Sequence, residues 1–336
     1  MSDLAALTQE FTFQRAALCS RDRRSTGELR QELVDLHETW LGQLAAHAGL
    51  NSFRVALVAV GGMGRREMCA NSDLDLLILH HPDESASAMA SLADSIWYPV
   101  WDAGIALDHS MRSVSQAKTL AGQDLKVLLG LLDARTIAGD DSLTQTLRAD
   151  VLADWRSTAS TRLLELRESV DERRARLSDL SHLLEPDLKE AYGGLRDATV
   201  LRAIAASWLT DVDHSALAEA TNHLLTVRDA LHRVTGRATD RLSMHDQAEV
   251  AQLQDLGTDD DLLRSVFVAG RTIAVSSDVA WHRVGRLTRK VSRFQRFTGQ
   301  RDERLPLADG VVAHDGEAVL ARDARPTQDA ALRSEE

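Results

Sequence analysis

The stretch VALVAVGGMGRREMCANSDLDLLILHH (residues 55–81) combines two apolar runs, a glycine pair and two closely spaced aspartates. Residues 53–60 are apolar and rich in β-branched side chains, which predicts a buried strand. Residues 72–80 predict a second strand, and Asp73 and Asp75 lie at its start. Because burying one carboxylate is costly and burying two together costs more, another group must compensate their charge.

The spacing of the two aspartates predicts a metal site. Residues two apart on a strand point to the same face, so Asp73 and Asp75 project together, while Leu74, Leu76 and Ile78 point to the other face and anchor the strand in the core. Unpaired, the two carboxylates would repel each other and one would take up a proton, whereas Mg²⁺ keeps both ionised. Two ions are compatible with such a pair, as in two-metal phosphoryl transfer. The alternative makes Asp73 a turn or cap residue and Asp75 a surface side chain.

The glycine pair Gly61–Gly62 follows the first strand and precedes a short helix expected at 65–69. A strand, a glycine turn and a helix present backbone N–H groups to an anion, and Arg65 adds a charged fork for phosphate. The turn is not a P-loop, because no GK[ST] follows, and it lacks the G-x-G-x-x-G spacing of a dinucleotide fingerprint. By itself the pair fits a plain tight turn equally well.

The pattern along the chain predicts an α/β (α+β) domain with a small mixed sheet, followed by an all-α helical domain. We expect an N-terminal helical segment at 1–50, the α/β domain at 51–149, the helical domain at 150–300 and a partly disordered, linker-like tail at 301–336. In the tail, LPLADGVVAHDG fits a small hairpin. Beyond the two strands already described, the expected elements are a helix at 85–103, a strand at 104–112, helices up to about 149, and helices at 151–180, 195–209, 214–236 and 259–297.

The composition fits a folded soluble protein, with 44% hydrophobic and 27% charged residues. The net charge of −12 disfavours nucleic-acid binding, which needs a basic face. The two cysteines, Cys19 and Cys69, form neither a disulfide framework nor a metal motif. No signal peptide is evident, and no apolar run approaches the roughly 20 residues of a membrane helix. We therefore expect a cytoplasmic protein that acts without nucleic acid or membrane.

Four segments resemble one enzyme family, in the same order. The arrangement strand, GG, D-x-D, strand is similar to that of the DNA polymerase β-like nucleotidyltransferase superfamily. GGMGRREMCANSDLDLLIL (61–79) more narrowly resembles the bacterial PII uridylyltransferase family. WDAGIALDHSMRS (101–113), LLEPDLKEAYGGLRD (183–197) and LHRVTGRATDRL (231–242) also resemble segments of that family, and the segment at 183–197 is the most specific. The resemblance covers about residues 50–300.

The resemblance implies a nucleotidyltransferase domain at 51–149 with Asp73 and Asp75 as catalytic metal ligands. Asp108 is the candidate third carboxylate, either a metal ligand or a base, and its alternative is a structural turn residue. We expect the adjacent His109 to be packed and not catalytic.

The resemblance also implies that the helical domain at 150–300 closes over the nucleotide, with Glu185 as a further contributor. The alternative for the segment at 183–197 is a helix-capping turn, and Tyr192 departs from the family's usual proline. The Arg-rich run at 168–180 is expected to be a solvated helix face. The residues assigned to nucleotide binding are Gly61, Gly62, Arg65, Ser72, Lys189, Gly193, Gly194, Arg196 and Asp197.

The implied function is Mg²⁺-dependent transfer of UMP from UTP to a tyrosine of the trimeric PII nitrogen-signalling protein. AMP transfer from ATP is an alternative, because family members of similar composition are associated with adenylylation. The D-x-D pair disfavours a non-catalytic nucleotide-binding regulator, and the acidic charge and the 183–197 segment disfavour transfer to a small molecule or a tRNA end.

The family's phosphohydrolase (HD) and ligand-sensing (ACT) domains have no counterpart in these 336 residues. The dipeptides His245-Asp246 and His314-Asp315 lack partner histidines at suitable spacing. We therefore expect transfer without the uridylyl-removing HD activity.

Overall fold

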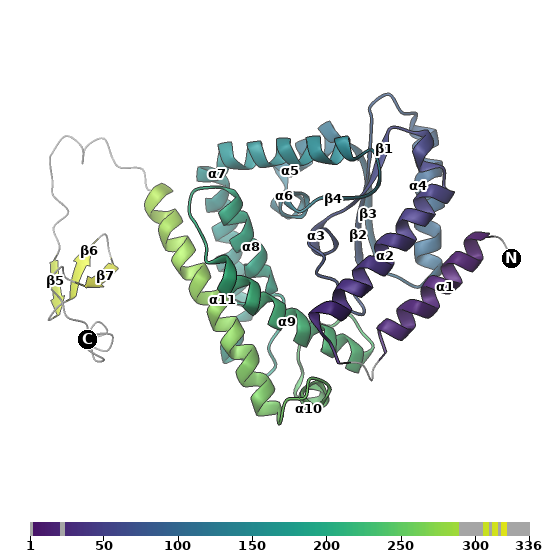
Figure 1. Cartoon of the computed structure of the whole chain (residues 1–336). Helices are drawn as coiled ribbons and strands as arrows, with labels where there is room; N and C mark the ends of the chain where they lie inside the picture. The colour runs from purple at the N-terminus through teal and green to yellow at the C-terminus, as the bar shows by residue number, and fades with distance from the viewer. Residues whose placement is uncertain (1–2, 21–23, 289–304, 309–310, 315–316, 321–336) are drawn as a thin grey trace, which may run out of the picture. The chain divides into compact units, whose positions relative to one another are not determined.

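The computed structural model describes residues 3–20, 24–288, 305–308, 311–314 and 317–320. The chain forms two compact units, residues 1–287 and 288–336 (Figure 1). None of the helices in these described ranges is long and apolar enough to cross a membrane.

In the second unit the described residues form the three antiparallel strands β5 (Leu305–Ala308), β6 (Val311–His314) and β7 (Glu317–Leu320), in the order β5-β6-β7. The β5–β6 pair confirms the expected hairpin, and β7 is an additional strand. The expected disorder of the last residues falls on 321–336, which lie outside the described residues.

The α/β part of the first unit is built on one mixed sheet of order β3-β2-β1-β4. Strands β1 (Val55–Ala59) and β2 (Leu74–His80) are antiparallel, and β3 (Leu107–Ser113) runs parallel to β2. The mixed sheet and these three strands confirm the prediction. Strand β4 (Arg135–Gly139) pairs antiparallel with β1 and was missed, because its five residues lie in a segment whose pattern predicted only helices.

The sheet separates two hydrophobic cores. One face of β2 (Leu74, Leu76 and Ile78) contributes to the core that includes α2 (Gly27–His47) and α4 (Ala86–Asp102), as its alternation predicted. The other face belongs to the core that contains α5 (Val114–Gln123), α6 (Leu125–Leu132) and the long helix α7 (Asp141–Leu177). The N-terminal helix α1 (Asp3–Leu18) packs on α2, with the rings of Phe11 and Trp40 stacked 3.8 Å apart.

The rest of the first unit is helical. Helices α8 (Leu195–Ala206), α9 (His214–Thr235) and α11 (Asp259–Thr288) confirm predicted segments, whereas α10 (Met244–Leu253) was not predicted. Residues 289–297 of the helix expected at 259–297 lie outside the described residues. Helix α7 is continuous through residues 149 and 150 and joins the sheet to the helical part. Trp155 on α7 is buried there and donates its indole N–H to the carbonyl of Ala203 on α8 (2.8 Å).

Candidate active site

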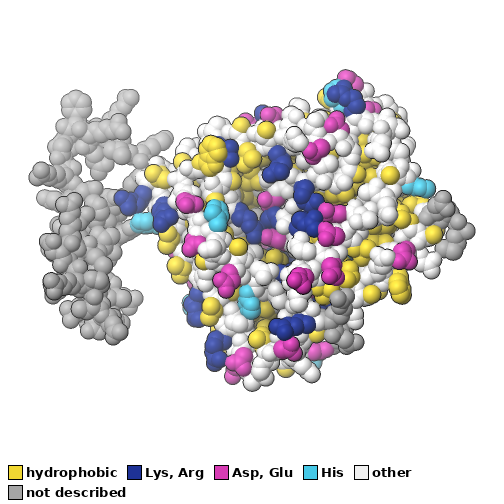
Figure 2. Space-filling view, viewed as in Figure 1, with side chains coloured by type: hydrophobic (Ala, Val, Ile, Leu, Met, Phe, Trp, Pro, Cys, Tyr) yellow, Lys and Arg dark blue, Asp and Glu magenta, His cyan; other side chains and the backbone are white. Residues whose placement is uncertain are grey.

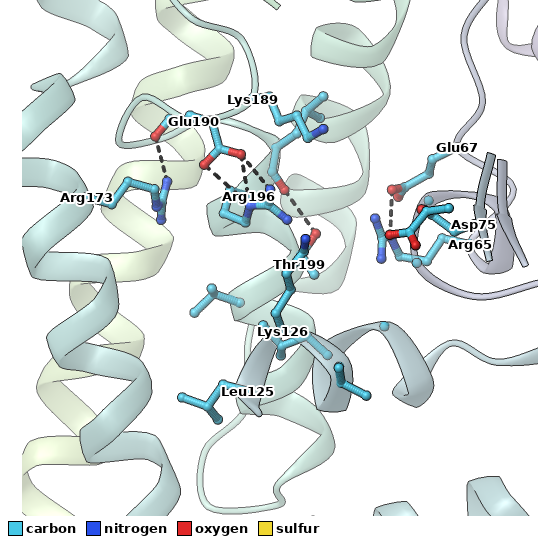
Figure 3. Close-up of a pocket in the computed structure, with 18 of the residues that line it drawn as sticks. Arg65, Glu67, Asp75, Leu125, Lys126, Arg173, Lys189, Glu190, Arg196 and Thr199 are labelled. Carbon is cyan, nitrogen blue, oxygen red and sulfur yellow. Dashed lines mark hydrogen bonds and ion pairs between the residues drawn. The ribbon is translucent and has the colours of Figure 1, made fainter. Parts of the chain in front are cut away.

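A cavity of about 690 Å³ lies between the aspartate-bearing strands and the helices α6, α7 and α8. Figure 3 shows Asp75, Arg65 and Glu67 on one side of it and Lys189 and Arg196 on another. In the space-filling view, basic and acidic side chains meet near the middle of the face shown (Figure 2). A cavity of this size lined by convergent charged groups is a default candidate for a ligand site.

Three carboxylates form one wall of the cavity. Asp75 lies on β2 and Asp73 immediately before it, while Asp108 on β3 is the register partner of Asp75. Burial, together with the charges of Asp73 and Asp108, raises the pKa of Asp75 to about 6. A cation is the group that would relieve this repulsion.

These carboxylates fit Mg²⁺, which takes one or two carboxylates and completes its shell with water and phosphate oxygens. The described residues contain no ready cluster of three or more His, Cys, Asp or Glu side chains around a metal position. The His245-Asp246 dipeptide lies in the first turn of α10, where Asp246 accepts a hydrogen bond from Ser243 (2.6 Å), and Asp315 lies outside the described residues.

The glycine pair opens α3 (Gly61–Gly64), so the short helix begins at the glycines and not at 65–69 as expected. Gly61 has a φ of +55°, and a Cβ there would lie 2.7 Å from Oδ2 of Asp75. The Gly62 backbone lowers the pKa of Asp75, although burial and the neighbouring carboxylates outweigh this effect. Glycine at 61 is therefore needed for the close approach of the turn to the carboxylate, and both glycines line the cavity.

Arg65 lines the cavity but is already paired. Its Nε lies 2.7 Å from Oε2 of Glu67 and its Nη1 3.1 Å from Oδ2 of Asp133. Burial alone would lower the pKa of Arg65, but these two carboxylates outweigh it and raise that pKa. Oε1 of Glu67 also forms an ion pair with Nη2 of Arg202 on α8 (2.5 Å). Arg65 therefore belongs to a network that joins the glycine turn to the helical part.

Lys189 and Arg196 lie on the opposite wall and also have acidic neighbours. The Nζ of Lys189 is 3.8 Å from Oδ2 of Asp240, and Nη2 of Arg196 is 2.6 Å from Oε1 of Glu190. Each basic side chain is about one third exposed (35% and 37%), which leaves it accessible to an anion in the cavity.

Three predicted nucleotide-binding residues, Gly193, Gly194 and Asp197, lie outside the cavity lining. The N–H of Gly193 donates to Oδ2 of Asp197 (2.7 Å), and Asp197 is fully buried in an ion pair with Arg173. A Cβ on Gly193, whose φ is +88°, would lie 2.4 Å from the carbonyl oxygen of Gly270 on α11. Their contacts fix the loop that carries Lys189 and Arg196 against α7 and α11.

Ser72 lines the cavity, and its Oγ accepts the N–H of Cys69 (3.0 Å). Glu185 lies outside the lining, where it forms an ion pair with Arg241 and accepts the N–H of Met244 (3.1 Å). Tyr192 donates its hydroxyl to Oδ1 of Asp278 (2.6 Å).

Four basic residues that the sequence reasoning missed also line the cavity. Arg228 on α9 pairs with Asp240 (2.5 Å), and its Nη1 is 3.5 Å from Oγ of Ser72, so it ties α9 to the loop before β2. Arg228 lies just before the 231–242 segment, and the resemblance of that segment to the family was the only sequence feature that pointed to it. Arg173 is 7% exposed, which corrects the expectation of a wholly solvated 168–180 face, because a buried aspartate from another element pairs with it. The four residues are Lys126, Arg173, Arg176 and Arg228.

His109 was expected to be packed; it contacts aromatic rings on one side but is otherwise exposed. Its ring centroid is 5.3 Å from that of Trp97 and 5.4 Å from that of Trp101, both on α4.

Comparisons with known proteins agree with this geometry. A sequence model described as GlnD PII-uridylyltransferase matches residues 162–278. The chain is 53% identical over 327 residues to a bifunctional uridylyltransferase/uridylyl-removing enzyme of Streptomyces coelicolor, which covers 95% of this chain and 39% of the relative. Proteins of the same name from Mycobacterium tuberculosis (41% identity; 90% of this chain, 38% of the relative) and Methylococcus capsulatus (32%; 72% and 31%) are also similar.

The chain therefore spans about two fifths, or less, of the length of these relatives. The matches cover both walls of the cavity: the family model includes the basic segment at 183–197, and the long alignment with the Streptomyces protein covers 95% of the chain. By sequence, residues 162–278 carry the PII-uridylyltransferase family domain, and nearly the whole chain is similar to part of these bifunctional enzymes.

Proposed function

We propose that this chain transfers UMP from UTP to a tyrosine hydroxyl of a PII signalling protein, with Mg²⁺ held by Asp73 and Asp75. The observation that carries the proposal is the placement of Asp73, Asp75 and Asp108 opposite Lys189 and Arg196 across one cavity. The names of the relatives favour UTP as the donor and UMP as the transferred group.

The two walls divide the work of binding the donor. Mg²⁺ bound at Asp73 and Asp75 would neutralise and orient the phosphates. Lys189 and Arg196, with Lys126 and Arg176 along the same cavity, hold the phosphate oxygens that the metal does not reach. Gly61 and Gly62 keep the backbone close to the carboxylates, whereas Gly193, Gly194 and Asp197 position the loop behind the basic wall.

The reaction is an in-line displacement at the α-phosphorus. The tyrosine oxygen forms a bond to that phosphorus, the bond from the phosphorus to the β-phosphate bridging oxygen breaks, and pyrophosphate leaves. We assign to Asp108 the role of accepting the tyrosine proton, because it is exposed on β3 and lines the cavity beside Asp75. Positioning and charge neutralisation provide most of the acceleration.

The test is labelling of purified PII protein with UTP or ATP, with Mg²⁺ or with excess chelator, followed by the mass added to its tyrosine. We expect a UMP adduct that requires Mg²⁺ and that falls by about 10³-fold in Asp73→Asn. The matched control is Asp171→Asn, an exposed aspartate on α7 outside the cavity. Labelling that survives in Asp73→Asn would overturn the proposed mechanism. An AMP adduct would overturn the assignment of UTP as the donor. UTP binding without any adduct would favour a non-catalytic nucleotide-binding regulator.

A further inference from the structure

Strand β3 forms an open edge of the sheet next to the candidate site. Among the described residues it pairs with β2 alone, and only the last of its seven residues, Ser113, is buried. An edge strand presents unpaired N–H and C=O groups that can pair with another chain, and proteins often block such edges with Pro, Lys or a bulge. The sequence LDHSMRS contains neither residue, and its pairing with β2 is regular throughout. The opposite edge strand, β4, is shorter, and its partner register is irregular.

The two faces of β3 lead to different surroundings. Leu107, His109 and Met111 face α4, as shown by the contact of His109 with Trp97 and by the packing of the other two on the α2–α4 core. Asp108 lies on the other face, at the cavity. An extended segment added to this edge continues the alternation, so that every second side chain turns toward the Asp108 face.

The α4 side of this edge carries exposed aromatic rings. Trp101 is 42% and Tyr98 58% exposed, and their ring centroids are 5.4 Å apart. Trp101 also contacts His109 (5.4 Å). Exposed aromatic residues of this kind are typical anchors of protein interfaces. We call Tyr98, Trp101 and His109 the edge aromatic cluster.

Arg112 supplies a charge on the Asp108 face of the strand. It is four residues further along β3, about 13 Å from Asp108 at the rise of a strand. No ion pair or hydrogen bond of its guanidinium is found among the residues that the structure describes. An arginine without an acidic partner among the described residues is complementary to an acidic side chain on an added segment.

We infer that the open edge of β3 docks an extended, tyrosine-bearing segment of the protein acceptor. This inference rests on the proposed function, because it assigns the acceptor's position at the same site. The acceptor tyrosine points toward Asp108, its immediate neighbours in sequence are apolar and contact the edge aromatic cluster, and an acidic residue four positions away pairs with Arg112. The occupant is the acceptor because the edge runs continuously into the carboxylate wall where transfer takes place.

The first test measures the transfer kinetics of Trp101→Ala and Arg112→Glu with PII protein and UTP. We expect KM for the acceptor to rise about tenfold in each, while KM for UTP stays within about twofold. The matched controls are Phe13→Ala, an exposed aromatic on α1, and Arg148→Glu, an exposed arginine on α7, which packs on β4. Unchanged acceptor KM in both edge variants, with active wild-type protein, would overturn the docking surface and leave the proposed function standing. Loss of transfer in the wild-type chain would instead count against the proposed function.

The second test is hydrogen exchange of the wild-type chain with and without PII protein, which requires no variant to fold. Binding should slow exchange of the alternate amides within residues 107–113 that face away from β2, and should leave residues 135–139 of β4 unchanged. Protection of β3 that grows with the concentration of this chain alone would show a second copy on the edge and would overturn the proposal. Equal exchange of residues 107–113 with and without the acceptor would also overturn the proposal.

Discussion

The two walls of the cavity handle charge in opposite ways. On the strand wall, Asp73, Asp75 and Asp108 face one another, and the pKa of Asp75 rises to about 6 through burial and their repulsion. On the helical wall, Lys189 and Arg196 each have a carboxylate partner. Under the proposed function, a bound cation would balance the charge of the strand wall, whereas the helical wall would exchange its internal partners for the phosphates of the nucleotide.

The largest effect is expected where the helical wall is held in place. Asp197 is fully buried and pairs with Arg173, so Asp197→Asn leaves a buried guanidinium without its counter-charge. We expect the free energy of unfolding to fall by about 3–5 kcal/mol, measured by urea denaturation. The control Asp171→Asn breaks an exposed pair with Arg167 and should change stability by less than about 0.5 kcal/mol. Equal stability of the two variants would contradict the structural role assigned to Asp197.

An intermediate effect is expected on the strand wall, as a pH dependence. Burial and the neighbouring charges of Asp73 and Asp108 raise the pKa of Asp75 from 3.8 to about 6 in the folded chain. The folded state therefore binds the proton more tightly than the unfolded state, and this contribution to stability is complete below pH 4 and is lost as the pH rises through 6. The upper limit is about 3 kcal/mol at 1.36 kcal/mol per pKa unit, and partial exposure reduces it.

The measurement is the urea-unfolding free energy of the wild type and of Asp75→Asn between pH 4 and pH 7. The fall in stability over this range should be smaller in Asp75→Asn. Millimolar Mg²⁺ should restore wild-type stability at pH 7 and have little effect on the variant, because binding to the folded state alone is stabilising. Identical pH profiles of the two proteins would show that Asp75 does not titrate as the structure indicates.

The difference between the two walls also explains which parts of the candidate site could be predicted from the sequence. The strand wall follows from local rules: alternation predicted Leu74, Leu76 and Ile78 in the core, and the D-x-D spacing involves only Asp75 on β2 and Asp73 immediately before this strand. The position of Asp108 needed the parallel pairing of β3 with β2, which a single sequence suggests only by resemblance.

The helical wall depends on contacts between residues far apart in the chain. Arg228 meets Ser72 across 156 positions, and Lys189 on this wall pairs with Asp240, 51 positions away, so no local pattern predicts either contact. Resemblance marked the 183–197 loop, but not which of its residues face the cavity. Lys189 and Arg196 face the cavity and Asp197 is buried. This arrangement follows from the tight packing of Gly193 against Gly270 and of Gly194 against the preceding turn.

The smallest effect is expected from weakening the ion pair between Arg196 and Glu190 on the helical wall. Arg196 is held by Glu190, whose Oε1 lies 2.6 Å from Nη2 of the guanidinium. If phosphate binding requires this pair to open, Glu190→Gln weakens the competing interaction and should lower KM for UTP about two- to threefold, in line with the small worth of a partly exposed ion pair. Arg196→Gln should raise KM for UTP instead, and the double variant should resemble Arg196→Gln, because Arg196 is the ion-pair partner of the Glu190 side chain. A rise of KM in Glu190→Gln would show that the carboxylate holds Arg196 in its binding position and does not compete with the nucleotide.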